Sequence, residues 1–234
     1  MNIDQRPLAP SPYEGLDVPT FTLSSSVLTD GAPMPESATA EAGSLSPDLT
    51  WHGFPEDTAS FMLTCFDPDA PIPSGWWHWA ILDIPSSMTH LEAGAGASDL
   101  MLDGPAFHLR GDAGEASYFG AAPPAGDRPH RYVFTVHALD TDSLGLDDDA
   151  TPAMASFAAL QHTIARASLT VTHQACRLCC TLFFGSLKSR GTRAPLFACP
   201  HAPDRCCTWS SPWALTWTTR SFAAQAWITT TSRT

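Results

Sequence analysis

The chain has 234 residues, of which 44% are hydrophobic and 15% charged, and its formal net charge at pH 7 is −12. This length and composition favour a globular domain with a substantial core over a disordered chain. We expect a soluble, cytoplasmic protein, because no run of about 18 apolar residues occurs and the polar first twenty residues carry no secretory signal. The acidic balance argues against nucleic acid and anionic membrane surfaces as partners.

The charge of the chain changes sign near residue 175. Residues 1–174 hold 5 Arg, no Lys and 23 Asp or Glu, a formal charge of −18. Residues 175–234 hold 6 Arg, 1 Lys and a single Asp, a formal charge of +6. We therefore divide the chain into an N-terminal extension (1–17), a domain (18–174) and a C-terminal tail (175–234).

The tail is rich in Cys, Trp, Ser and Thr and holds six of the seven cysteines. A zinc site is one hypothesis, but Cys176-x₂-Cys179 is not followed by a second pair at that spacing. A disulfide-bonded domain is another, but it would need an oxidising compartment. We favour the interpretation that the tail was not selected to fold with the domain, for instance because the reading frame shifts or a stop is missed near codon 175. The tail would then be out of frame or disordered.

Several short strands are predicted in the first third of the domain. Residues 21–28 alternate in the manner of a first strand, and a Pro/Gly-rich turn at 30–35 ends it. Residues 44–51 lead to Trp51, which we expect in the core. Residues 60–66 form a nearly continuous apolar run with β-branched and aromatic side chains, which predicts a buried strand.

A proline-rich loop follows this strand and carries two carboxylates, Asp67 and Asp69. Three prolines, Pro71 among them, fix φ and remove backbone donors, so the loop is a preset irregular turn. The next strand is predicted at 76–84. Alternation there places His78 on the face of Ala80, opposite the neighbouring tryptophans.

A second long strand, at 130–139, supplies another histidine and a tyrosine. Its alternation puts His130 and Tyr132 on one face and Arg131 and His137 on the other. We interpret Arg131 as the ion-pair partner of an acidic residue. His137 is interpreted as structural.

Loops and one helix account for most of the remaining domain. We predict an irregular loop at 92–114 and a solvated acidic loop at 140–149. Thr151 as N-cap and Pro152 at the first helical position begin an amphipathic helix with Arg166 in its last turn, before a final strand at 167–172. The residues at helical spacing are Met154, Phe157, Leu160 or Gln161, and Ile164.

Five short motifs run through the domain. They are Ser46-Pro-Asp-Leu-Thr-Trp51, Asp67-Pro-Asp-Ala-Pro71, Trp77-His-Trp79, Tyr118-Phe-Gly-Ala-Ala-Pro-Pro124 and His130-Arg-Tyr132. In order and spacing they resemble the phosphatidylethanolamine-binding protein family, in particular its bacterial and archaeal Raf-kinase-inhibitor-like branch. Each motif alone is unspecific, but the set is highly specific and covers residues 18–174.

The resemblance implies an all-β fold, a β-sandwich of two antiparallel sheets with one or two peripheral α-helices. The sequence agrees, since about seven strand candidates and one helix are separated by Pro/Gly turns. The resemblance also implies a small cavity for a phosphate, acetate or phosphoryl headgroup, without metal or other cofactor. Carried over by motif, its ligand-binding residues are Asp67, Asp69, Pro71, His78, Gly120, His130 and Tyr132.

The residues themselves leave two roles open. Asp67 fits a ligand-site carboxylate or merely an acceptor that holds its own turn. His78 fits a ligand contact or a core histidine. If the site is real, we expect both His78 and His130 to gain proton affinity from nearby carboxylates and to act as cationic donors near neutral pH.

Three classes of function fit these residues. A binding or regulatory protein is favoured; the resemblance implies a small phosphorylated or carboxylated ligand, a protein kinase or serine protease as partner, and allows a homodimer. A hydrolase is an alternative, although no Gly-x-Ser-x-Gly motif or phosphate-binding glycine loop occurs. A metal-dependent enzyme using the Asp/His cluster is the third, without any local ligand spacing to support it.

Overall fold

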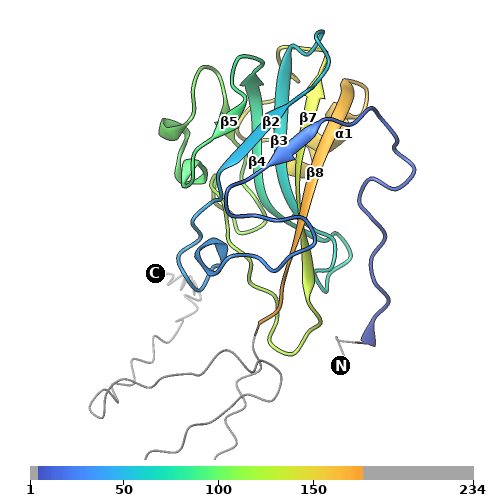
Figure 1. Cartoon of the computed structure of the whole chain (residues 1–234), viewed down its shortest axis with the longest axis vertical. Coiled ribbons are helices and arrows are strands. Elements are labelled where there is room, and N and C mark those ends of the chain that lie inside the picture. The colour runs from blue at the N-terminus through green and yellow to red at the C-terminus, as the bar shows by residue number, and fades with distance from the viewer. Residues whose placement is uncertain (1–4, 176–234) are drawn as a thin grey trace, which may run out of the picture. The chain divides into compact units, whose positions relative to one another are not determined.

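The structure is a computed structural model that describes residues 5–175. Our interpretation of the tail, including the zinc and disulfide hypotheses, concerns residues outside this range. The regular elements are β1 (Thr22–Ser24), η2 (Glu36–Ala38), β2 (Leu49–His52), β3 (Ser60–Asp67), β4 (Trp76–Pro85), β5 (His90–Leu91), η3 (Ala95–Ala97), η4 (Asp99–Met101), β6 (Phe107–His108), β7 (His130–Leu139), α1 (Pro152–Ala159) and β8 (Thr163–His173), where η marks a 3₁₀ turn (Figure 1).

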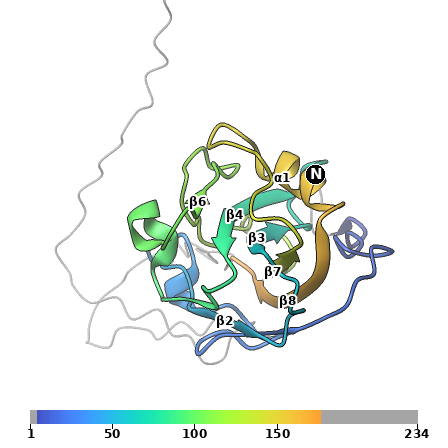
Figure 2. The same cartoon turned by 90° about the horizontal axis from the view of Figure 1, so that it is seen from above.

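The strands form two antiparallel sheets, as the sequence predicts. The smaller sheet has the order β1-β2-β5 and the larger one β6-β4-β3-β7-β8. In Figure 2, β2 and α1 lie on opposite sides of the larger sheet. The larger sheet is therefore covered on both faces, which explains why the sequence of β3 is almost continuously apolar.

The main core lies between the two sheets. It contains Trp51 from β2, Phe61 and Leu63 from β3, and Phe134 from β7, all fully buried. The core position expected for Trp51 is confirmed. A second cluster on the outer face joins Met62 and its neighbours to the small residues of α1.

A β-bulge in β4 corrects the predicted placement of His78. Trp79 pairs with Cys65 and Trp77 with Phe66, so His78 is left without a partner on β3. The extra residue shifts the alternation, and His78 turns to the inner face, where its ring lies 5.0 Å from that of Tyr132. The prediction that His78 shares a face with Ala80 is therefore wrong.

Alternation along β7 is confirmed. Tyr132, Phe134 and Val136 all belong to the inner core, and His130 precedes them on the same face. His137 lies on the outer face beside Tyr13. The irregular segment predicted at 92–114 is also largely confirmed, but it contains two 3₁₀ turns and the two-residue strand β6, which pairs with Ile81 and Leu82.

The helix is shorter than predicted and uses a different face. Thr151 caps it, accepting a hydrogen bond from the Met154 N–H at 3.2 Å, as expected. The helix ends at Ala159, and β8 begins at Thr163, because the β-branched side chains there pair with β7. Small residues, including Ala155, approach the sheet, whereas Phe157 is 75% exposed. Met154, Phe157 and Leu160 of the predicted stripe thus face outward, whereas Ile164 belongs to β8 and packs against the main core.

The N-terminal segment before β1 lies along the outer face of the larger sheet. The Arg166 N–H donates to the Pro19 carbonyl at 2.9 Å, and Arg131 donates to the Ala9 carbonyl at 2.7 Å. Tyr13 reaches His137, with 3.2 Å between the hydroxyl and Nε2. We call residues 5–20 the N-terminal strap.

Burial predicts opposite outcomes for two aromatic substitutions. Trp51→Ala should lower the free energy of unfolding by about 3–5 kcal/mol, because a fully buried ring is lost. Phe157→Ala should change it by less than about 0.5 kcal/mol, because the ring is largely exposed. Urea unfolding of both variants measures this, and a large loss for Phe157→Ala would show that α1 buries its apolar stripe after all.

Candidate functional site

The candidate site forms at one end of the larger sheet, where three strands end or begin. Asp67 is the last residue of β3, His78 lies near the start of β4, and His130 is the first residue of β7. Because both neighbours run antiparallel to β3, their first residues lie beside its last ones. The topology thus brings together side chains that are up to 63 residues apart in sequence.

His78 is held by the backbone of Phe119. Its Nδ1 lies 2.8 Å from the Phe119 carbonyl oxygen, and the Phe119 N–H donates to the His78 carbonyl at 2.9 Å. Since a carbonyl only accepts, Nδ1 carries a hydrogen, and in the neutral ring Nε2 is left as an acceptor. The two rings also stack, with centroids 5.9 Å apart.

Tyr132 places a hydroxyl group in the core beside His78. The side chain is 1% exposed, and its oxygen has no hydrogen-bond partner among the residues described. The Ala122 N–H is near enough to lower the pKa of the hydroxyl slightly but does not reach hydrogen-bonding geometry. Burial prevails and raises the pKa of Tyr132 well above its ordinary value, so the hydroxyl keeps its proton.

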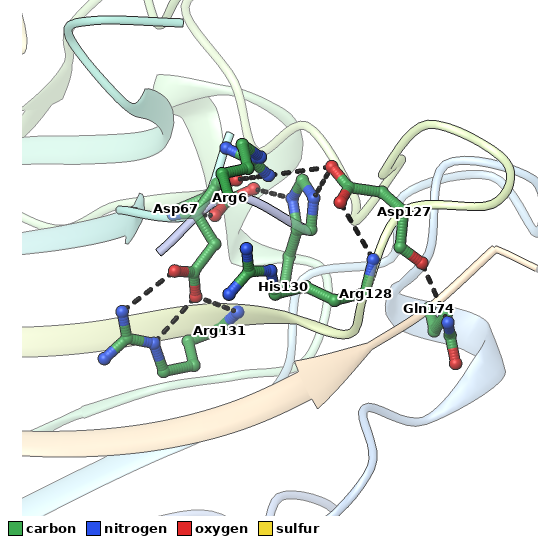
Figure 3. A network of polar contacts seen from close by, with 8 residues as sticks. Arg6, Asp67, Asp127, Arg128, His130, Arg131 and Gln174 are labelled. Carbon is green, nitrogen blue, oxygen red and sulfur yellow. Dashed lines mark hydrogen bonds and ion pairs between the residues drawn. The ribbon is translucent and has the colours of Figure 1, made fainter. Parts of the chain in front are cut away.

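His130 lies between two carboxylates. Its Nδ1 is 2.7 Å from an oxygen of Asp67, and its Nε2 is 2.9 Å from an oxygen of Asp127 (Figure 3). All three side chains are at most 4% exposed. Because both acceptors are carboxylates, both ring nitrogens donate when the imidazole is protonated.

Two arginines flank this buried group. Arg6 from the N-terminal strap donates to Asp127 at 2.7 Å and also to the Asp69 carbonyl (Figure 3). Arg131 binds the Asp69 carboxylate with two side-chain nitrogens, at 2.7 and 2.9 Å. The interpretation of Arg131 as an ion-pair partner is therefore confirmed.

The charges of this network balance. The cations are Arg6, Arg131 and protonated His130, and the anions are Asp67, Asp69 and Asp127. Asp67 also accepts the Asp69 N–H at 2.7 Å, so it holds its own turn and a histidine at once. The sequence left two roles open for the Asp67 carboxylate, as an acceptor that holds its own turn and as a member of the site. The two roles are compatible.

The two histidines of the site have opposite proton affinities. Burial opposes the charged form of His130, but hydrogen bonds to Asp67 and Asp127 outweigh it and raise its pKa. For His78, burial dominates over the Phe119 carbonyl and the more distant Asp67, and its pKa is lowered. The expectation that His78 is a cation near neutral pH is therefore wrong for the protein without ligand.

The remaining predicted residues lie around this group. Gly120 is packed against residues 38–40, where an added Cβ would lie 2.5 Å from the Ala40 nitrogen. Only glycine therefore fits at position 120. The preceding residue is Phe119, whose backbone holds His78. Asp69 is buried and occupied by Arg131, whereas Pro71 is exposed in the loop after it.

Sequence reasoning missed three groups that complete the site. The Phe119 carbonyl gives no sequence signal, because any residue has one. Asp127 could have been found, since it lies in the Pro/Gly turn three residues before His130. Arg6 is the only Lys or Arg among the first 109 residues, which contain many carboxylates. This isolation in the sequence was a signal that Arg6 binds a specific carboxylate.

Two further observations concern a metal site and membrane-spanning helices. Within residues 5–175, no group of three or more His, Cys, Asp or Glu side chains is arranged to hold a metal ion. In the same range, no helix has both the length and the apolar character required to cross a bilayer.

The fold is a sandwich of two antiparallel sheets with a buried Asp–His cluster at one end of the larger sheet. A sequence model described as phosphatidylethanolamine-binding protein matches residues 24–174, and the chain belongs to this family. Two relatives from Escherichia coli K12 are UPF0098 protein YbcL, 43% identical over 57% of this chain and 74% of its own length, and UPF0098 protein YbhB, 42% identical over 56% and 82%. The crystal structure of YbcL, described as a new member of the mammalian PEBP family, aligns with a TM-score of 0.64 at 38% identity, over 66% of this chain and 98% of YbcL.

The network predicts separate titrations for the histidines. Because carboxylates stabilise its charged form, His130 should titrate above about 6.5, whereas buried His78 should titrate below that value. Asp127→Asn removes one of the two stabilising charges and should lower the pKa of His130. Nitrogen-15 NMR of the imidazole rings measures both values.

Asp140→Asn is the matched control, because Asp140 binds a different, exposed histidine, His162, at 2.8 Å. It should leave the pKa of His130 unchanged. An unchanged pKa in Asp127→Asn as well would contradict the double-carboxylate account.

Proposed function

We propose that this protein binds a small ligand by a phosphoryl or carboxylate headgroup, held between His78 and Tyr132. The family supports a binding role, and the protein's own geometry supports these two residues as the ligand contacts. Most other polar groups of the site are already committed. His130 uses both ring nitrogens on carboxylates, and Asp69 is bound by Arg131.

The observation that carries this proposal is the unpartnered Tyr132 hydroxyl. A buried polar group without a hydrogen bond costs about 1–3 kcal/mol of stability. A ligand oxygen that accepts from this hydroxyl would recover that free energy on binding. The group is preorganised, because Tyr132 is fixed in the inner core beside the His78 ring.

His78 supplies the second contact. Its Nδ1 is committed to Phe119, so only Nε2 is left for a ligand, and this atom donates only when the ring is protonated. Burial disfavours the charged imidazolium form of His78. A bound anion favours this form, because it places an opposite charge beside the ring. Binding of an anion is then linked to uptake of one proton.

The rest of the predicted set positions these two contacts. Asp67 and His130 hold the ends of β3 and β7 together, and Asp69 with Arg131 fixes the loop. Gly120 allows the Phe119 segment to approach closely enough to bond His78. We assign Pro71 to the exposed rim.

Regulation of a protein kinase or a serine protease is the cellular role that the family resemblance predicts, in the cytoplasm and with a homodimer allowed. We propose that the headgroup site reports ligand occupancy to such a partner. A hydrolase or metal enzyme is less well supported, because the nitrogens of His130 are both occupied and His78 has a single nitrogen left.

The headgroup proposal is tested with dimethyl phosphate, whose single negative charge does not change between pH 5 and 8. Affinity should rise as pH falls from 7 to 5, because the bound form holds one more proton on His78 and the pKa of this residue in the free protein lies below its ordinary value of about 6.5. Isothermal titration calorimetry at several pH values, in buffers of different ionisation enthalpy, measures affinity and proton uptake together.

Two substitutions and one control complete this test. Tyr132→Phe should weaken binding about tenfold or more without unfolding the domain, since it removes an unpartnered hydroxyl. His78→Gln should abolish the pH dependence. His162→Gln, in an exposed histidine, should change neither. Equal affinity of Tyr132→Phe and the parent protein would refute the site.

A further inference from the structure

A second concave region lies on the outer face of the larger sheet. It consists of two adjoining hollows, of about 500 and 320 Å³, between the N-terminal strap and the side chains of β8 and α1. Both hollows share Tyr13, Leu16 and Arg166 in their walls. Their volumes are in the range of small-molecule sites. Neither wall contains His78 or Tyr132, so this region is separate from the headgroup site.

The smaller hollow is mainly apolar. The rings of Phe66 and Trp77 line it, with centroids 4.4 Å apart, together with Phe157 and Leu160 of α1. Phe157 is 75% and Leu160 51% exposed, and Leu16 on the opposite rim is 43% exposed. Large apolar side chains gathered around a hollow indicate a surface that an apolar ligand would cover.

The wall formed by the strap is held in place by a chain of hydrogen bonds. The Thr163 hydroxyl donates to the Ala159 carbonyl at 2.7 Å, so its oxygen accepts from His137 Nδ1 at 3.3 Å. His137 Nε2 then has no hydrogen and accepts from the Tyr13 hydroxyl at 3.2 Å. Burial and the charge of Arg166 lower the pKa of His137 to about 3, so this neutral arrangement is kept at every ordinary pH.

Among residues 5–175, Arg166 is the one cation that lines both hollows. Its guanidinium lies 4.1 Å above the centre of the Tyr13 ring and donates to the Leu16 carbonyl at 3.0 Å, but its Nε has no hydrogen-bond partner among the described residues. Burial lowers its pKa, although Tyr13 and Asp17 act in the opposite direction, and Asp17 lines the larger hollow without forming an ion pair with Arg166. The charge is therefore only partly compensated.

We propose that this region is a second ligand site, which takes an amphipathic molecule with a short hydrocarbon chain and one anionic headgroup, such as a carboxylate. The chain would lie over Phe66, Trp77 and the exposed side of α1. The headgroup would lie at Arg166. A cation that is only partly compensated, beside an apolar hollow, is complementary to that chemistry and to neither a neutral nor a cationic amphiphile.

Octanoate, 1-octanol and octylammonium have the same chain and differ in headgroup charge. Calorimetric titration of the full chain should show octanoate binding at least tenfold more tightly than octanol, and octylammonium more weakly still. Arg166→Gln should remove the preference for octanoate over octanol. Equal binding of octanoate and octanol to the unaltered protein would overturn the anionic part of the proposal.

Phe157→Asp should weaken octanoate binding at least tenfold, because it places a carboxylate at the apolar rim of the hollow. Met154→Asp is the matched control, since Met154 is 54% exposed on the same helix but lies outside the hollow. It should leave the affinity unchanged. Thermal melts of both variants establish that the domain is folded, and equal weakening by the two substitutions would contradict a localised site.

Tyr132→Phe distinguishes this site from the headgroup site, which would also accept a carboxylate. Octanoate affinity should be unchanged in Tyr132→Phe, and dimethyl phosphate should not displace octanoate. If Tyr132→Phe weakens octanoate binding while Phe157→Asp does not, the octanoate lies at the headgroup site and the second site is refuted.

Discussion

A buried imidazolium between two carboxylates connects the parts of this domain that the candidate site needs. His130 begins β7, Asp67 ends β3, and Asp127 lies in the turn that leads into β7. Burying three ionisable groups costs several kcal/mol per ion unless each charge is compensated by geometry and hydrogen bonds. The structure meets this condition with Arg6, which binds Asp127 at one end, and with the Asp69 N–H, which donates to Asp67 at the other. The N-terminal strap contributes Arg6 and is thereby connected to the candidate site.

Charge balance also explains why the acidic composition of the domain is compatible with the anion-binding role that we propose. The conspicuous Asp–His cluster presents little net charge to a ligand, because its carboxylates are satisfied within the protein. Two less conspicuous groups, the second nitrogen of His78 and the hydroxyl of Tyr132, are left over beside it. The cluster therefore fixes geometry, and under our proposal the affinity for a ligand comes from short-range hydrogen bonds rather than from the long-range field.

Local patterns predicted the parts of this fold that depend on local rules. Alternation in β7 sorted His130 and Tyr132 from Arg131 and His137 correctly, because that strand is regular until its end. The same rule failed for His78. One extra residue in β4 reverses the face on which the preceding side chains of this strand lie. A bulge depends on pairing between strands, which a single segment does not encode. The helix failed for a related reason: the sheet surface accepts alanines, and the periodic large residues of α1 were left outside.

Because of the bulge at His78, the orientation of this histidine depends more on the number of residues in the segment around it than on their identity. The Trp77 side chain faces outward, and the side chains of His78 and Trp79 both face inward. Only this number of residues brings the imidazole to the Phe119 carbonyl. Exchange of a neighbouring side chain alters the packing around His78 but leaves the number of residues, and therefore its orientation, unchanged. Loss or gain of one codon would instead rotate the histidine toward the helix side and leave the carbonyl without its donor. Variation by substitution can thus refine this site gradually, whereas variation by insertion or deletion can only keep it or remove it.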